Sequence, residues 1–257
     1  MGDSSRKIVI GDVHGQFDAL MQLLGAIAPS DDDQVCFVGD LIDRGPKSAH
    51  VVDFVMNSPY DCLLGNHEKM LLDLLQEGPQ QQQILHSWIM SGGQATLMSY
   101  EDLFHNPGIP SNHIDWLAKL PLYKDWGDYW LVHAGVDPAL PVEVQTAQQF
   151  CWIRDPFHAS ADPYFEDKTI ITGHTITFTL PGIEPGEIVQ GNGWIDIDTG
   201  AYHPRSGWMT ALDVSNDLVY QVNVYAPQSR VLPFQDIVRS ISPEQIRNRA
   251  AQVAALP

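Results

Sequence analysis

The sequence predicts an α/β protein in which at least half of a sheet is parallel. Three short apolar runs, at residues 6–11 (a β-branched one), 34–38 and 62–64, each end in a polar turn and are followed by a helical pattern. This repeated order of strand, turn and helix is typical of βαβ units, whose two strands run parallel. A largely β-rich second half follows, so helices and strands are not confined to separate domains.

The remaining elements follow from periodicity and turn residues. Residues from about 71 to 119 read as mostly helical, with loops at 78–79, 92–93 and 106–110. Five further strands are predicted, at 129–132, 169–172, 194–197, 209–214 and 218–224. Asp217 marks a hairpin turn in the last pair, and Ser242 begins a capping pattern before a short helix. We expect one domain over residues 1–257, with a helical insertion at about 71–120 and a C-terminal extension from about 226.

Composition excludes several classes of protein. Hydrophobic residues make up 44% of the chain and charged residues 18%, which is an ordinary globular mixture. The formal net charge of −18 argues against a nucleic-acid partner, because such binding depends largely on Lys and Arg. The sequence contains no apolar run long enough to span a bilayer, so we expect no membrane partner and a cytoplasmic location.

The three cysteines point to buried thiols rather than to catalysis or a disulfide framework. A cysteine-based phosphatase needs an arginine in a phosphate-binding loop several residues after its nucleophile. Neither Cys62 nor Cys151 is followed by such a loop. The cysteines are therefore expected to be structural.

Five polar clusters end or follow predicted strands, and they bring together residues suited to metal binding. They are Asp12 with His14, Asp40 with Asp43 and Arg44, Asn66 with His67, His133, and His174. Each cluster alone has a structural explanation as a helix cap, a turn or a packed histidine. Because carboxyl ends of strands converge at one edge of an α/β sheet, the clusters are expected to meet. Oxygen and imidazole ligands in this mixture suit Mn, Fe or Zn, and a shared carboxylate would bridge two ions.

The motifs that carry these residues resemble those of the phosphoprotein phosphatase (PPP) family. They are GDVHG at 11–15, GDLIDRG at 39–45 and GNHE at 65–68, with His133 in LVHAG and His174 in TGHT. The segments WIMSGG at 88–93, WIR at 152–154 and DTGA at 198–201 further resemble the bacterial and bacteriophage lambda phosphatase-like branch. The resemblance runs from about residue 8 to 210. It implies a metallophosphoesterase-type α/β/β/α sandwich with mixed sheets and a metal site at the carboxyl ends of strands.

The resemblance also implies a role for each motif residue. Asp12 and His14 would bind one divalent ion, Asp40 would bridge, and Asn66, His133 and His174 would complete the second site. Mn is the expected metal, with Fe or Zn as alternatives. A hydroxide held between the ions would attack phosphorus in line. Around this centre, Arg44 and Arg154 would bind the phosphate oxygens, His67 would protonate the leaving group, and Asp43 would orient His67.

Phosphate monoesters are the predicted substrates, with a protein Ser/Thr phosphatase as the leading hypothesis and phosphotyrosine and small phosphate esters as further substrates. Dinucleoside polyphosphate hydrolases that cleave diadenosine tetraphosphate share these motifs, and Trp152-Ile-Arg154 mildly favours the phosphatase. A nuclease is disfavoured because its third motif usually ends in Asn-His-Asp and its second lacks the Asp43-Arg44 pair. A non-catalytic binding module is disfavoured because every expected ligand is present. The sequence does not indicate a regulatory partner.

Overall fold

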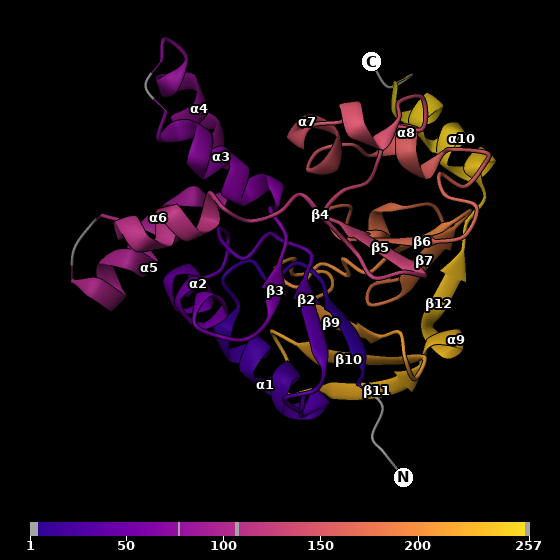
Figure 1. Ribbon diagram of the computed structural model, residues 1–257, viewed down its shortest axis with the longest axis horizontal. Helices are drawn as coiled ribbons and strands as arrows, with labels where there is room; N and C mark the ends of the chain where they lie inside the picture. The colour runs from indigo at the N-terminus through magenta and orange to yellow at the C-terminus, as the bar shows by residue number, and fades with distance from the viewer. Residues whose placement is uncertain (1–4, 77, 106–107, 255–257) are drawn as a thin grey trace.

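The computed structural model describes residues 5–76, 78–105 and 108–254, and within them two six-stranded sheets pack face to face (Figure 1). The first sheet has the order β11-β10-β9-β1-β2-β3, and the second β12-β7-β8-β6-β5-β4. The strands of the first sheet are β1 (Lys7–Ile10), β2 (Gln34–Phe37), β3 (Asp61–Cys62), β9 (Trp208–Asp213), β10 (Leu218–Asn223) and β11 (Ser229–Pro233). Those of the second are β4 (Tyr123–Asp125), β5 (Tyr129–Val132), β6 (Thr169–Thr172), β7 (Ile188–Gly191), β8 (Trp194–Asp196) and β12 (Val238–Ser240).

Both sheets are mixed, as predicted. In the first, β1, β2 and β3 run parallel, while β9, β10 and β11 are antiparallel to their neighbours. In the second, β5, β6 and β8 run parallel, while β4 and β7 pair antiparallel with β5 and β8. In the first sheet the three parallel strands form one half, with β3 at the edge, and in the second β5, β6 and β8 are interior strands, so within each sheet their carboxyl ends lie at the same edge.

The alternation of side chains along the central strands divides the protein into layers. In β1, Ile8 and Ile10 pack with the helices on the outer face, while Val9 faces the core between the sheets. In β5, Leu131 enters that same core, while Trp130 and Val132 face the helices of the other outer layer. Two outer helical layers and two sheets make the predicted α/β/β/α sandwich.

The helices cover the outer faces and form one protruding region (Figure 1). Helices α1 (Phe17–Ile27) and α2 (Ser48–Met56) lie on the first sheet, and α7 (Ala147–Phe150), α8 (Asp155–His158) and α10 (Pro243–Ala254) lie on the side of the second. Between β3 and β4 come α3 (Asn66–Leu74), α4 (Gln81–Trp88), α5 (Gln94–Phe104) and α6 (Ser111–Leu117). Helices α5 and α6 contact α2, whereas α4 extends from α3 away from the sheets. Short elements complete the chain: α9 (Phe234–Ile237), η2 (Val142–Val144) and η3 (Thr177–Thr179).

Several sequence predictions differ from the structure in detail. The loop predicted at 92–93 is reduced to a sharp turn at Gly92, where the backbone leaves the helical region within η1 (Ile89–Gly93), between α4 and α5. Gly92 makes this turn possible with a φ of 112°. Strands β4, β7, β11 and β12 were not predicted, because β4, β11 and β12 have partly exposed edge positions and lack an apolar run. The hairpin of β9 and β10 around Asp217 is confirmed. Of the loop predicted at 106–110, residues 106 and 107 lie outside the described residues.

Among the described residues, we find no helix long and apolar enough to cross a membrane.

Candidate metal centre

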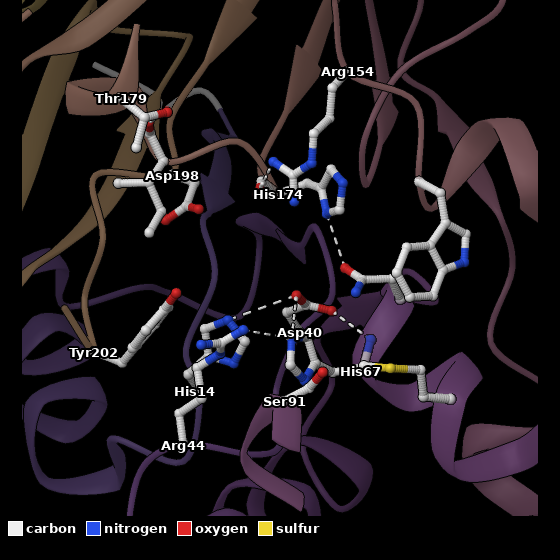
Figure 2. A pocket seen from close by; sticks show the side chains of 14 residues that line it. His14, Asp40, Arg44, His67, Ser91, Arg154, His174, Thr179, Asp198 and Tyr202 are labelled. Atoms are coloured by element: carbon white, nitrogen blue, oxygen red, sulfur yellow. Dashed lines mark hydrogen bonds and ion pairs between the residues drawn. The ribbon is translucent and has the colours of Figure 1, made fainter. Parts of the chain in front are cut away.

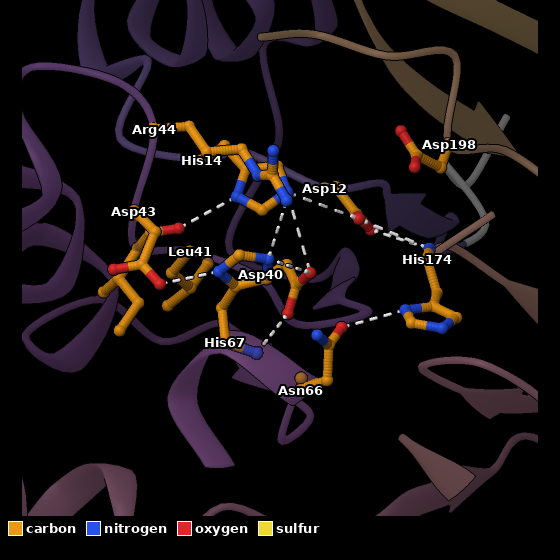
Figure 3. Close-up of polar contacts among 12 residues, drawn as sticks. Asp12, His14, Asp40, Leu41, Asp43, Arg44, Asn66, His67, His174 and Asp198 are labelled. Atoms are coloured by element: carbon orange, nitrogen blue, oxygen red, sulfur yellow. Dashed lines mark hydrogen bonds and ion pairs between the residues drawn. The ribbon is translucent and has the colours of Figure 1, made fainter. Parts of the chain in front are cut away.

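All five predicted polar clusters follow the carboxyl ends of parallel strands, and Figure 3 shows residues of four of them close together. Asp12 and His14 follow β1, Asp40 follows β2, and Asn66 begins α3 just after β3. The second sheet contributes the histidines His133, after β5, and His174, after β6. The six side chains predicted to bind metal are therefore neighbours in space although they are distant in sequence.

Asp40 is shared by two groups of possible ligands. Its Oδ2 lies 3.6 Å from His14 Nε2, and its Oδ1 lies 3.3 Å from His133 Nε2. The ligand atoms of Asp40, His133 and His174 all lie within 4.8 Å of one another, as do those of His14, Asp40 and His67. A carboxylate with one oxygen facing each group has the geometry of a bridging ligand.

Asn66 and Asp12 complete the two groups. His133 Nε2 and His174 Nδ1 lie 2.9 and 2.8 Å from Asn66 Oδ1, so three possible ligand atoms converge there. Asp12 Oδ2 lies 3.9 Å from His14 Nε2, and the carboxylate also accepts the backbone N–H of His174. Asp12 thus belongs on the His14 side of Asp40 and connects the two sheets.

The charges of this cluster fit divalent cations. Burial, and then repulsion from Asp198 and Asp40, raises the pKa of Asp12 well above its usual value. Burial, and then His67, lowers the pKa of His14 to about 3, which keeps the imidazole neutral as metal binding requires. The Nε2 atom of His174 is buried without a hydrogen-bond partner. Buried carboxylates, neutral imidazoles and an amide oxygen form a donor set that suits a pair of transition-metal ions.

The backbone around these ligands is held in unusual conformations. His14, Asp40 and His174 have φ values of 48°, 51° and 70°, in the left-handed region that non-glycine residues seldom adopt. Asp43 and Arg44 have φ values of 72° and 68°. Such strain is concentrated at functional sites, where the surrounding structure compensates for its cost.

Much of that compensation comes from Glu68, whose role the sequence analysis missed. Its carboxylate is fully buried and accepts four backbone N–H groups. The donors are Asp40 and Gly65 to Oε2, at 2.9 and 3.0 Å, and Leu41 and Ile42 to Oε1, at 2.8 and 3.2 Å. Glu68 thereby ties the first turn of α3 to the loop that carries Asp40. The sequence did contain a signal for this role: Glu68 lies three residues after Gly65, the position from which a glutamate side chain caps the start of a helix.

Asp43 and His67 form a buried pair with further support. His67 Nδ1 lies 2.6 Å from Asp43 Oδ2. Trp88 Nε1 donates to the same Asp43 oxygen at 2.9 Å, and Thr96 Oγ1 donates to Asp43 Oδ1 at 2.6 Å. These contacts leave His67 Nε2 directed toward the pocket, 3.4 Å from Arg44 Nη2. The sequence analysis gave neither residue a role in the site: Trp88 was quoted only as part of the WIMSGG segment, and Thr96 lies in the helical segment outside the motifs.

The cluster opens into a cavity of about 310 Å³ lined by both predicted arginines (Figure 2). Arg154 donates from Nη1 to His174 O and to Thr175 Oγ1, both at 3.1 Å. Arg44 lies over the ring of Tyr202, 4.2 Å from its centroid. The structure therefore places Arg44, Arg154, His67 and the ligand cluster around one opening.

Asp198 is a further residue of the pocket that the sequence analysis did not include. It follows β8, is buried, and accepts the N–H of Gly200 at 2.9 Å. Burial raises its pKa to about 6. A polar residue directly after a predicted strand was the available signal, the same one that identified the other five clusters.

Comparisons with known proteins agree with this site. The chain is 30% identical over 136 residues to the symmetrical bis(5'-nucleosyl)-tetraphosphatase of Vibrio campbellii, covering 51% of this chain and 44% of the relative. It thus spans less than half the length of that curated relative. A solved structure assigned provisionally as a diadenosine tetraphosphatase superposes with a TM-score of 0.62 at 20% identity, covering 86% of this chain and 95% of that one. A protein serine/threonine phosphatase from Saccharomyces cerevisiae superposes with a TM-score of 0.54 at 15% identity, covering 82% and 73%.

These two superpositions concern the fold alone, because both identities are low. The decisive match is to a family model, that of the calcineurin-like phosphoesterases, which covers residues 5–196 and includes every predicted ligand. Members of this family are metal-dependent phosphoesterases, and the Asp40-centred cluster provides the expected donor set. The chain therefore belongs to the calcineurin-like phosphoesterase family.

Proposed function

We propose that this chain is a metal-dependent hydrolase of dinucleoside polyphosphates that cleaves bis(5'-nucleosyl) tetraphosphates symmetrically. The observation that carries this proposal is the 30% identity over 136 residues with a symmetrical bis(5'-nucleosyl)-tetraphosphatase. The likeness to the yeast protein phosphatase is one of fold, at 15% identity. This reverses the order of the two substrate classes given by the sequence, where Trp152-Ile-Arg154 favoured a protein phosphatase.

The proposed metal ligands are those of the sequence analysis. Asp12, His14 and Asp40 would hold one ion, and Asp40, Asn66, His133 and His174 the other. Their geometry supports this assignment, since Asp40 presents one oxygen to each group. When bound, two divalent ions neutralise charge on the phosphoryl oxygens and lower the pKa of a water molecule.

Arg44 and Arg154 are proposed to bind the oxygens of the phosphoryl group under attack. In the part of the chain that the structure describes, neither forms an ion pair with an Asp or Glu. Both guanidinium groups line the cavity and retain N–H donors for an anion. Held on opposite sides of the ligand cluster by Tyr202 and His174, they would fix the phosphoryl group for in-line attack.

His67 is proposed as the general acid. Water adds to one inner phosphorus, the bridging P–O bond breaks, and the departing oxygen receives a proton from His67 Nε2, so two nucleoside diphosphates result. Asp43 accepts the Nδ1–H at 2.6 Å and holds the imidazolium in position. A diphosphate leaving group is much less basic than an alkoxide and needs this proton less.

The test is a side-by-side assay of metal-stripped protein with added Mn on a phosphoserine peptide, a phosphotyrosine peptide and diadenosine tetraphosphate. We expect the highest kcat/KM for the dinucleotide, with ADP as the sole nucleotide product. Formation of AMP and ATP would overturn symmetric cleavage. A higher kcat/KM for the peptides would restore the protein phosphatase hypothesis and show its residue preference. Inactivity on all three, with or without metal, would leave a binding module on this fold.

A further inference from the structure

A row of aromatic rings with an arginine at each end leads away from the metal centre. Arg44 lies over Tyr202 at 4.2 Å, and Arg205 lies over Phe178 at 4.7 Å. The ring of His203 stands between them, with its centroid 6.1 Å from that of Tyr202 and 4.9 Å from that of Phe178. We call these three rings, with Arg44 and Arg205, the aromatic row.

The row begins at the reacting centre. The Tyr202 ring meets His14 edge-on, with centroids 4.7 Å apart. Tyr202 and Thr179 both line the cavity, and Thr179 follows Phe178 in η3 (Figure 2). Arg205 does not line the cavity itself, but it stacks on Phe178, the chain neighbour of the lining residue Thr179.

The row is positive although the chain has a net charge of −18. Within the described part of the chain, neither Arg44 nor Arg205 forms an ion pair with a carboxylate. Partial burial, followed by the charges of Arg205 and Arg44, lowers the pKa of His203. A guanidinium stacked on a ring still directs its in-plane N–H donors outward, which suits it to binding phosphate.

The loop that carries Tyr202, His203 and Arg205 has a fixed conformation. It begins and ends with Gly200 and Gly207, whose φ values of 80° and 71° only glycine adopts readily. Tyr225 donates from its hydroxyl to Tyr202 O, and Arg205 N donates to His203 Nδ1 at 3.1 Å. The position of Arg205 is thus set by backbone contacts as well as by Phe178.

We propose that Arg205 binds phosphate groups of a polyphosphate chain beyond the phosphoryl group under attack, with the aromatic row as its support. This proposal rests on the proposed function and extends it, because it assigns a residue that selects polyphosphates over monoesters. A monoester carries its charge at a single phosphoryl group, which the ligand cluster, Arg44 and Arg154 are already proposed to bind. A dinucleoside tetraphosphate carries a charge on each successive phosphoryl group, so it needs cations placed farther from the metals.

The first experiment compares diadenosine tetraphosphate with p-nitrophenyl phosphate as substrates for Arg205→Met and Arg205→Lys. Methionine keeps an apolar stem against Phe178 and removes the charge, whereas lysine keeps the charge. We expect Arg205→Met to lower kcat/KM for the dinucleotide about 5- to 20-fold, mainly through KM. Its effect on p-nitrophenyl phosphate should be less than about twofold, and lysine should restore most of the loss. Arg239→Met, which removes an arginine paired with Glu187, is the matched control and should lower neither rate. Equal losses on both substrates, or no loss on the dinucleotide, would overturn the proposal.

A second experiment separates this subsite from the proposed function. Inorganic tripolyphosphate and orthophosphate are compared as competitive inhibitors of p-nitrophenyl phosphate hydrolysis, with Mn in excess. We expect Arg205→Met to raise the inhibition constant of tripolyphosphate about fivefold or more, and that of orthophosphate much less. If the wild type fails to cleave the dinucleotide but this shift is seen, the proposed substrate is wrong and the subsite stands. An unshifted tripolyphosphate constant overturns the subsite, whether or not the dinucleotide is cleaved.

Discussion

The side of the site built on the first sheet is supported far more densely than the side built on the second. On the first side, Glu68 accepts four backbone N–H groups, and Asp43 receives contacts from His67, Trp88 and Thr96. On the second, Arg154 has two acceptors, and the buried His158 leaves both ring nitrogens without a hydrogen bond.

The difference follows from how the chain supplies each side. The first side comes from three consecutive strand-to-helix turns, each with several polar residues that can bond one another. The second comes from single residues after β5, β6 and β8, separated by long loops. We infer that the first side fixes the positions of Asp40 and of the proposed acid His67, while the second side adds His133, His174 and Arg154.

The largest expected effect comes from Asp40, where the two sides meet. Asp40→Asn removes the one charge shared by both ligand groups, so affinity for both ions should fall and kcat/KM should drop about 10³-fold. Metal content after dialysis, measured by elemental analysis, checks this result. Loss of one ion only would show that the two sides bind metal independently, which would contradict a bridging role. Asp73→Asn, in the half-buried ion pair with Lys69 and outside the ligand cluster, is the control and should keep both ions.

The next largest effect tests the acid of the first side. His67→Asn should lower kcat about 10²-fold or more for a phosphoserine peptide and much less for p-nitrophenyl phosphate and diadenosine tetraphosphate, because their leaving groups need less protonation. Metal content should stay the same as in the wild type. Equal losses on all substrates would remove His67 from the acid role, and its closeness to His14 and Asp40 would then indicate a metal ligand.

The third prediction compares one buried carboxylate on each side. Glu68→Gln leaves an amide N–H₂ facing backbone donors, so the free energy of unfolding should fall by about 1–3 kcal/mol, with about 10-fold weaker metal binding or more. Asp196→Asn, on the second side, should lower the free energy of unfolding by less, because Asp196 accepts only the N–H of Asp198 among its described hydrogen bonds. Chemical denaturation and metal titration of both variants measure the contrast. Equal losses would show that the two sides are supported equally.

The smallest effect concerns Trp88. Trp88→Phe removes the donor to Asp43 Oδ2 but keeps an apolar ring, and Thr96 still donates to the other oxygen. We expect a loss of about 3- to 10-fold in kcat on the phosphoserine peptide, at unchanged metal content. Trp130→Phe, in the core of the second outer layer, is the matched control and should affect stability without this loss. A larger effect from the control would assign Trp88 to packing.

The same contrast explains what the sequence could predict. The parallel strands, the ligand clusters and the mixed sheets were predictable, because contiguous polar residues after β-branched runs mark the carboxyl ends of strands. The role of Glu68 was missed because its partners are backbone N–H groups, which leave no pattern in the sequence. Trp88 and Thr96 were missed because both bond Asp43, which lies 45 and 53 residues before them, and no periodicity predicts such distant contacts. Edge strands β4 and β11 were missed because exposed residues alternate with partly buried ones along them, so neither strand contains a continuous apolar run. The substrate class depended on sequence relatives, since motifs for the metals are shared by several classes of phosphoesterase.

The ligand cluster also has a consequence for folding. Asp40 and Asn66 belong to one sheet, and His133 and His174 belong to the other, so an ion bound among them would join the two halves of the sandwich. Ligands that bind only the folded state stabilise it in proportion to the logarithm of their concentration, by about 2.7 kcal/mol at one hundred times Kd. Bound Mn should therefore stabilise the packing of the two sheets against each other. The melting temperature should then rise with Mn concentration, even in variants that have lost activity but kept every ligand.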